Sequence, residues 1–199
     1  MSFQCGLNNV KLSLVATKQI DNRMIAETGN RLVDGKVAFV TGAARGLGHT
    51  IVNEMAVAGA VGVMFDILPQ SEAGDIPDGW NYARGDVTNQ DDVGMAMADL
   101  GEHHGQLDIA VANAGVVPPW SSISELDIDQ WHRTFAVNVD GVAITIKFAS
   151  KHMMRSGGSI VAMGSLNSWQ GHPKQACLLY TSPSPRDFSC NLVFRLQLE

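Results

Sequence analysis

The chain has 199 residues, of which 45% are hydrophobic and 17% charged, so its composition favours a packed core over intrinsic disorder. Its 14 basic and 20 acidic side chains give a formal net charge of −6 without any basic run, which argues against nucleic acid or a membrane surface as partner. Three cysteines without metal-ligand spacing predict no metal site. Because we find neither a membrane-length apolar stretch nor a secretory signal pattern, we expect a cytoplasmic protein.

Short apolar runs alternate with segments of helical spacing from residue 31 onward. Runs rich in β-branched residues predict buried strands, and apolar residues three and four positions apart predict helices between them. We expect the helix after the fourth strand to be irregular near Asn138–Gly141. In chain order the pattern predicts a strand at 37–41, a helix at 46–58, a strand at 61–66, a loop at 69–79, a strand at 80–84, a helix at 89–104, a strand at 107–112, a helix at 127–154 and a strand at 159–163.

This alternation implies right-handed βαβ crossovers and a parallel sheet with helices on both faces. The predicted fold class is therefore α/β, with three layers and a Rossmann-type doubly wound sheet. In such sheets ligands bind at the carboxyl ends of the strands. Polar and glycine-rich motifs follow the predicted strands at those ends.

The first motif joins the first predicted strand to the first predicted helix. It reads Thr41-Gly-Ala-Ala-Arg-Gly-Leu-Gly48. Glycines allow a tight turn and close approach to a pyrophosphate, and the helix start offers free N–H groups. An ordinary tight turn is the alternative interpretation. We take Gly42, Arg45, Gly46, Leu47 and Gly48 as candidate cofactor-binding residues.

An acidic residue, Asp66, ends the second predicted strand, 18 residues after Gly48. A carboxylate at this place can accept hydrogen bonds from the ribose hydroxyls of NAD and would repel the 2′-phosphate of NADP. A solvated strand-end residue is the alternative. Arg45 argues the other way, since a cation beside the loop can accept a phosphate. We favour NAD as the cofactor.

Two further turns follow the third and fourth predicted strands. Asp86 and Val87 follow the third strand, and Asn113, Ala114 and Gly115 follow the fourth. Asp, Asn and Gly are common turn formers, so each turn alone has a plain structural explanation. Their occurrence at successive strand ends makes them candidate cofactor-binding residues as well.

Together these motifs resemble the short-chain dehydrogenase/reductase family over about residues 31–176. The resemblance implies an NAD(P)-dependent oxidoreductase that interconverts small-molecule alcohols and carbonyl compounds. It also implies that the motifs hold adenine and ribose and form the sheet edge beneath the nicotinamide. Asn138 would anchor a water in a proton relay through its backbone, and Ser165 would hydrogen-bond the substrate oxygen, so these two are the candidate catalytic residues.

The family's acid/base pair, a Tyr with a Lys four residues later, has no counterpart here. The two tyrosines, Tyr82 and Tyr180, are followed at that spacing by Asp86 and Ser184, and no lysine follows Lys174. Without a nearby cation, nothing obvious lowers a tyrosine pKa from about 10. We therefore assign neither tyrosine as catalytic and expect little or no turnover.

The chain divides into three segments. We interpret 1–30 as an N-terminal extension with Met24 as an alternative start, and 31–176 as an NAD(P)-binding Rossmann domain that is incomplete at its C-terminus. The stretch CLLYTSPSPRD at 177–187 resembles one reading frame of a sequencing-library adaptor, so we expect 177–199 to be artefactual. The intact parent is expected to form homo-oligomers. The alternatives to an enzyme are a non-catalytic dinucleotide-binding module and a non-functional fragment.

Overall fold

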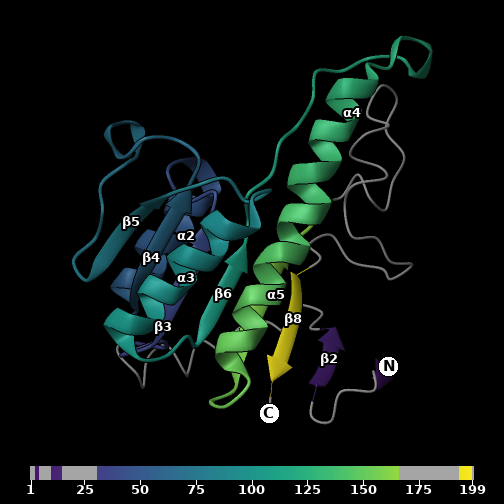
Figure 1. Ribbon diagram of the computed structural model, residues 1–199. Coiled ribbons are helices and arrows are strands. Elements are labelled where there is room, and N and C mark those ends of the chain that lie inside the picture. Colours follow the sequence, from purple (N-terminus) through teal and green to yellow (C-terminus); the bar gives the residue numbers. More distant parts are fainter. Residues whose placement is uncertain (1–2, 5–9, 15–30, 166–192, 199) are drawn as a thin grey trace.

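The computed structural model describes residues 3–4, 10–14, 31–165 and 193–198. Its centre is a set of five parallel strands in the spatial order β5-β4-β3-β6-β7, which confirms the predicted doubly wound sheet (Figure 1). The strand order reverses between β3 and β6, so a crevice is expected there. The strands are β3 (Val37–Thr41), β4 (Val61–Asp66), β5 (Trp80–Arg84), β6 (Ile109–Ala112) and β7 (Gly158–Met163).

Three antiparallel strands that the sequence pattern did not predict extend the sheet beyond β7. β8 (Val193–Leu198) pairs with β7, β2 (Val10–Leu14) pairs with β8, and β1 (Phe3–Gln4) pairs with β2. β8 lies within the segment 177–199, whose foreign origin stays a prediction.

The helices follow the strands as predicted, with one change in the longest. That helix consists of α4, a π-helical turn η3 and α5, and in η3 the N–H of Gly141 donates to the carbonyl of Ala136 five residues earlier. The irregularity expected near Asn138 is therefore a π-turn. No helix of the described part of the chain is long and apolar enough to cross a membrane. The helices are α2 (Gly46–Val57), α3 (Gln90–His104), α4 (Ile128–Phe135), η3 (Ala136–Asp140) and α5 (Gly141–Met153), with 3-10 turns η1 (Gln70–Glu72) and η2 (Ile123–Glu125).

The two faces of the sheet carry separate cores, because successive side chains of a strand point to opposite faces. On one face Phe39 and Phe65, with ring centroids 5.5 Å apart, pack under α3 and α5. On the other face Val40 and Met64 pack under α2, beside the buried Val52. Layers on both sides of the sheet leave the carboxyl ends of the strands as its open edge.

At the opposite, amino-terminal edge, Asp108 ties β6 to β3. Its carboxylate accepts hydrogen bonds from the Val37 N–H at 2.9 Å, from Lys36 Nζ at 3.0 Å and from Gln106 Nε2 at 2.8 Å. Burial alone would raise the pKa of Asp108, but these hydrogen bonds and the Lys36 charge hold it below its usual value. The strand predicted at 107–112 begins at Ile109 instead, after this side-chain junction.

Asp108→Asn should destabilise the fold by about 1–3 kcal/mol at pH 7, because the amide is a weaker acceptor and cannot pair with Lys36. Since the carboxylate has a lowered pKa when folded, its stabilisation is complete above the unfolded value of about 3.9 and is lost as the pH falls through the folded value. Urea unfolding at pH 7, 5, 4 and 3 should therefore show the gap between wild type and variant closing below about pH 4.

Asp99→Asn is the matched control, since Asp99 is exposed on α3. It should leave the free energy of unfolding nearly unchanged at every pH. An equal gap between wild type and Asp108→Asn at pH 7 and pH 3 would contradict the role given to the carboxylate charge.

Candidate functional site

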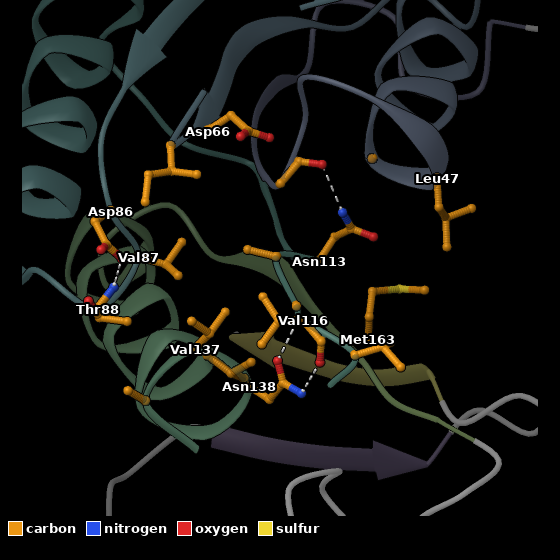
Figure 2. Close-up of a pocket in the computed structure, with 18 of the residues that line it drawn as sticks. Leu47, Asp66, Asp86, Val87, Thr88, Asn113, Val116, Val137, Asn138 and Met163 are labelled. Carbon is orange, nitrogen blue, oxygen red and sulfur yellow. Dashed lines mark hydrogen bonds between the residues drawn. The ribbon is translucent and has the colours of Figure 1, made fainter. Parts of the chain in front are cut away.

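A cavity of about 880 Å³ opens where the parallel strands end (Figure 2). Every candidate residue from the sequence lines it except Gly46, which is the first residue of α2. The structure thus brings together motifs that are separated by more than a hundred residues in the chain. The candidate residues that line the cavity are Gly42, Arg45, Leu47, Gly48, Asp66, Asp86, Val87, Asn113, Ala114, Gly115, Asn138 and Ser165.

The glycine-rich loop between β3 and α2 forms one wall. Gly42 has a φ of +65°, and a Cβ on Gly48 would lie 2.0 Å from the Gly42 carbonyl oxygen, so side chains at these places would disrupt the turn. Arg45 occupies the N-cap of α2 and makes no capping hydrogen bond with its side chain. The first N–H groups of α2 are thus available to an anion from the cavity.

The Asp66 carboxylate is held in place at the end of β4. Its Oδ2 accepts from the Ala44 N–H at 2.9 Å and its Oδ1 from the Leu68 N–H at 3.1 Å, and the residue is only 9% exposed. Each carboxylate oxygen has two lone pairs, so both keep acceptor capacity for a ligand. A fixed anion with spare acceptor capacity suits the hydroxyl groups of a ribose.

The segment that follows Asp66 is anchored by β5. Tyr82 donates its hydroxyl hydrogen to the Leu68 carbonyl at 2.8 Å, and Arg84 Nε donates to the Ile67 carbonyl at 3.2 Å. Burial, followed by the charge of Asp66, raises the pKa of Tyr82. A raised pKa keeps the phenol protonated, which suits an anchor and is the opposite of what an acid/base tyrosine needs.

The turn after β5 is closed by two carboxylates, one from the turn itself and one from α3. Asp86 Oδ1 accepts from the Thr88 N–H at 2.9 Å, and Asp92 at the start of α3 accepts from the Asp86 N–H at 2.9 Å. Val87 is 8% exposed and belongs to the core beneath α3 and α5. This turn therefore presents a polar rim and an apolar floor to the cavity, next to Asp66 in Figure 2.

Thr41 and Asn113 join the carboxyl ends of β3 and β6. The Thr41 hydroxyl accepts from the N–H groups of Asn113 and Ala114, both at 3.0 Å. The Asn113 side chain donates to the carbonyls of Thr41 at 3.0 Å and Gly42 at 3.2 Å. Thr41 is 1% exposed and does not line the cavity, so it is a positioning residue that we did not single out from the sequence.

Asn138 lies in the π-turn η3, and its side chain hydrogen-bonds to the backbone that follows β6. Its Oδ1 accepts from the Val116 N–H at 2.8 Å, and its Nδ2 donates to the Val116 carbonyl at 3.0 Å (Figure 2). The side chain is thus committed to the segment 113–117. Asn138 also lines the cavity, and the water relay expected of its backbone stays a prediction.

Ser165 and Met163 close the cavity from the end of β7. A serine hydroxyl can donate to, or accept from, an alcohol or carbonyl oxygen. Ser165 is the last residue described in this part of the chain, and Tyr180 lies outside the described residues.

Several lining residues were missed by the sequence reasoning, although simple signals could have found them. Ten of the twelve lie within two residues of a predicted one, as Thr88 follows Val87. Arg133 gave no such signal, because its place depends on how the helix containing it is turned. The missed residues are Ile67, Leu68, Gly85, Thr88, Val116, Val117, Arg133, Ala136, Val137, Val142, Met163 and Gly164.

Comparison with known sequences gives one family. The family model for short chain dehydrogenases matches residues 36–182. The chain is 40% identical to short-chain dehydrogenase reductase 4 of Arabidopsis thaliana over 149 residues, which are 72% of this chain and 50% of that protein. It is 36% identical to cis-4-hydroxycyclohexanecarboxylate dehydrogenase of Sinomonas cyclohexanicum over 137 residues, covering 66% and 55% of the two chains. The match therefore spans about half the length of these relatives.

A solved structure shows the same fold. Carveol dehydrogenase from Mycobacterium avium, crystallised in complex with NAD, matches with a TM-score of 0.68 and 28% sequence identity. The match covers 76% of this chain and 61% of that one.

Thr41→Val should destabilise the fold by about 2–4 kcal/mol, because it removes the acceptor of two backbone N–H groups at the β3–β6 junction. Thr41→Ser keeps the hydroxyl and should cost no more than about 1.5 kcal/mol for the lost methyl group. Urea unfolding of both variants measures the difference. Equal destabilisation by valine and serine would show that packing, and not the hydroxyl, fixes the junction.

Proposed function

Because the chain belongs to the short-chain dehydrogenase family, we propose that its cavity binds a nicotinamide dinucleotide for hydride transfer between an alcohol and a carbonyl group. The observation that carries this proposal is the position of the Asp66 carboxylate. It is held by the Ala44 N–H of the glycine-rich loop, so a fixed anion lies next to the uncapped start of α2. A pyrophosphate at the helix start and a ribose at the carboxylate can then be bound together.

The remaining wall residues take roles in order along the cavity. Val87 and the turn at Asp86 hold the adenine, and Asn113, Ala114 and Gly115 form the sheet edge beneath the nicotinamide. The pyrophosphate would lie against the glycine-rich loop and the start of α2, at Gly42, Arg45, Leu47 and Gly48. These roles are supported by the common cavity and by the family to which the chain belongs.

The preferred dinucleotide in this proposal is NAD. Asp66 would lie against the 2′ position of the ribose, where a carboxylate accepts hydrogen bonds from hydroxyls and repels a phosphate. Arg45 is exposed and can pair with the pyrophosphate. The presence of Arg45 therefore does not require a 2′-phosphate on the cofactor. The NAD complex of carveol dehydrogenase supports the same choice.

At the reacting end we assign to Ser165 the hydrogen bond with the substrate oxygen. We assign to Asn138 the task of holding the neighbouring backbone at Val116. NAD supplies the hydride acceptor when it is bound. Ser165 orients and polarises the substrate oxygen by hydrogen bonding. Ring alcohols or ketones are reasonable substrates, since the names of related proteins include a hydroxycyclohexanecarboxylate dehydrogenase and a 3beta-hydroxysteroid dehydrogenase. The homo-oligomer expected for the intact parent stays a prediction.

The sequence lacks the Tyr and Lys pair that would transfer the proton in the reaction. No Tyr is followed four residues later by Lys anywhere in the 199 residues. We propose that the chain as written binds the dinucleotide but turns over alcohols slowly or not at all. A non-catalytic dinucleotide-binding module is thus the second candidate function, favoured by the intact cofactor walls.

Titration of the full chain with NADH, followed by nucleotide fluorescence, should show saturable binding with a micromolar dissociation constant. An alcohol panel with NAD should give no NADH absorbance above the rate without protein. Binding without turnover supports the proposal, and rapid turnover would refute its catalytic part. A folded protein that fails to bind NADH would refute the dinucleotide site.

Asp66→Asn should narrow the preference for NADH over NADPH by about tenfold or more, since it removes the charge that repels the 2′-phosphate. The ratio of the two dissociation constants measures the preference. Asp78→Asn is the control, because Asp78 is exposed in the loop before β5 and does not line the cavity. An unchanged ratio in Asp66→Asn would show that Asp66 does not set the preference.

A further inference from the structure

Among the residues that the structure describes, two arginines and two carboxylates are the charged residues that line the cavity. Asp66 and Asp86 belong to the ends of β4 and β5, and Arg45 belongs to the glycine-rich loop. Arg133 comes from α4, on a different wall, and the proposed function gives it no role. Arg133 is exposed, and no ion pair of the described residues includes it, so its charge is available to an anionic group of a ligand in the cavity.

Arg133 projects from the side of α4 that faces the cavity. Thr134, the next residue, is buried and donates its hydroxyl hydrogen to the Gln130 carbonyl, which places the core side of α4 at that position. Val137 follows Arg133 by four residues, one turn along the helix, and also lines the cavity. Figure 2 shows Val137 between the turn at Val87–Thr88 and Asn138.

Within the part of the chain that the structure describes, neither an ion pair nor a helix end neutralises the charge of Arg133. Within residues 31–165 the ion pairs join Arg31 to Asp34 and Lys36 to Asp108, and none includes Arg133. Asp127 uses its carboxylate to cap α4, accepting from the N–H groups of Asp129 and Gln130. The helix dipole offers little, because α4 continues directly into η3 and α5 and so has no free carbonyl end near Arg133.

We propose that Arg133 is an oxyanion-binding residue of the cavity, which takes either a phosphate of the cofactor or a carboxylate of the substrate. The proposal rests on the proposed function for the identity of the cavity, but its chemistry is independent of nicotinamide. A guanidinium offers a planar fork of donors that matches both oxyanions, and its charge is not lost at any ordinary pH. The site would thus accept ligands with an anionic group on the α4 wall, in addition to whatever Arg45 binds.

The test uses the full chain with Arg133→Gln and Arg133→Lys, and with Arg155→Gln as the matched control. Arg155 is also exposed and lies in the turn that follows α5, but it does not line the cavity. Circular dichroism and the melting temperature check that each variant is folded. Calorimetry or amide NMR shifts then give dissociation constants for four probes: inorganic pyrophosphate, NADH, benzoate and its neutral isostere benzamide.

If the anion is a cofactor phosphate, Arg133→Gln should weaken pyrophosphate and NADH about tenfold or more, Arg133→Lys should weaken them less, and Arg155→Gln should change them less than twofold. If the anion is a substrate carboxylate, Arg133→Gln should weaken benzoate by a similar factor and leave benzamide and NADH unchanged. Either pattern supports the assignment and identifies its source.

Equal affinities of wild type, Arg133→Gln and Arg155→Gln for all four probes would overturn the proposal. The same holds if none of the anionic probes binds to the wild-type protein. Failure of NADH alone, with Arg133-dependent binding of pyrophosphate or benzoate, would refute the dinucleotide site and leave the role of Arg133 standing.

Discussion

The hydroxyl of Thr41 is the contact on which the cavity depends. β3 and β6 are neighbours in the sheet but lead to connections on opposite sides, so their backbones must separate where the strands end. Thr41 accepts from two N–H groups of the departing β6 segment, and Asn113 returns two hydrogen bonds to the β3 end. These four bonds set the position of the glycine-rich loop relative to Gly115 and therefore the width of the crevice.

The parallel sheet could be predicted because its strands are buried on both faces and read as short apolar runs. The predicted bounds of β3, β4 and β5 agree with the structure to the residue. Half of the lining residues were found, and all of these but Asn138 for a related reason: they follow a strand end, and strand ends in such a sheet meet at one edge. The irregularity of the long helix was predicted from the Asn and Gly near residue 140, although not its π-helical form.

The contacts that join distant segments could not be predicted in the same way. Nothing in the neighbourhood of Thr41 shows that its hydroxyl will meet amides more than 70 residues later. Asp108 reads as a strand residue, yet its carboxylate ties the start of β6 to β3. Arg133 reads as a solvated helix residue, because only the packing of α4 decides which of its sides faces the cavity. In each case tertiary geometry supplies the partner that local pattern does not show.

The pair of hydrogen bonds between Asn138 and Val116 has a consequence for which residues this helix can carry. The carboxamide presents one donor and one acceptor to a backbone N–H and C=O, and so takes the place of a peptide group in a neighbouring strand. An ionised aspartate, almost identical in shape, has no proton to donate and would set its charge against the Val116 carbonyl. A leucine would leave both backbone groups without this partner. The Asn138 side chain, although it belongs to a helix, therefore gives Val116 the two hydrogen bonds that a neighbouring strand would give. It does so beyond the end of β6, where no strand of the described residues is paired with this segment.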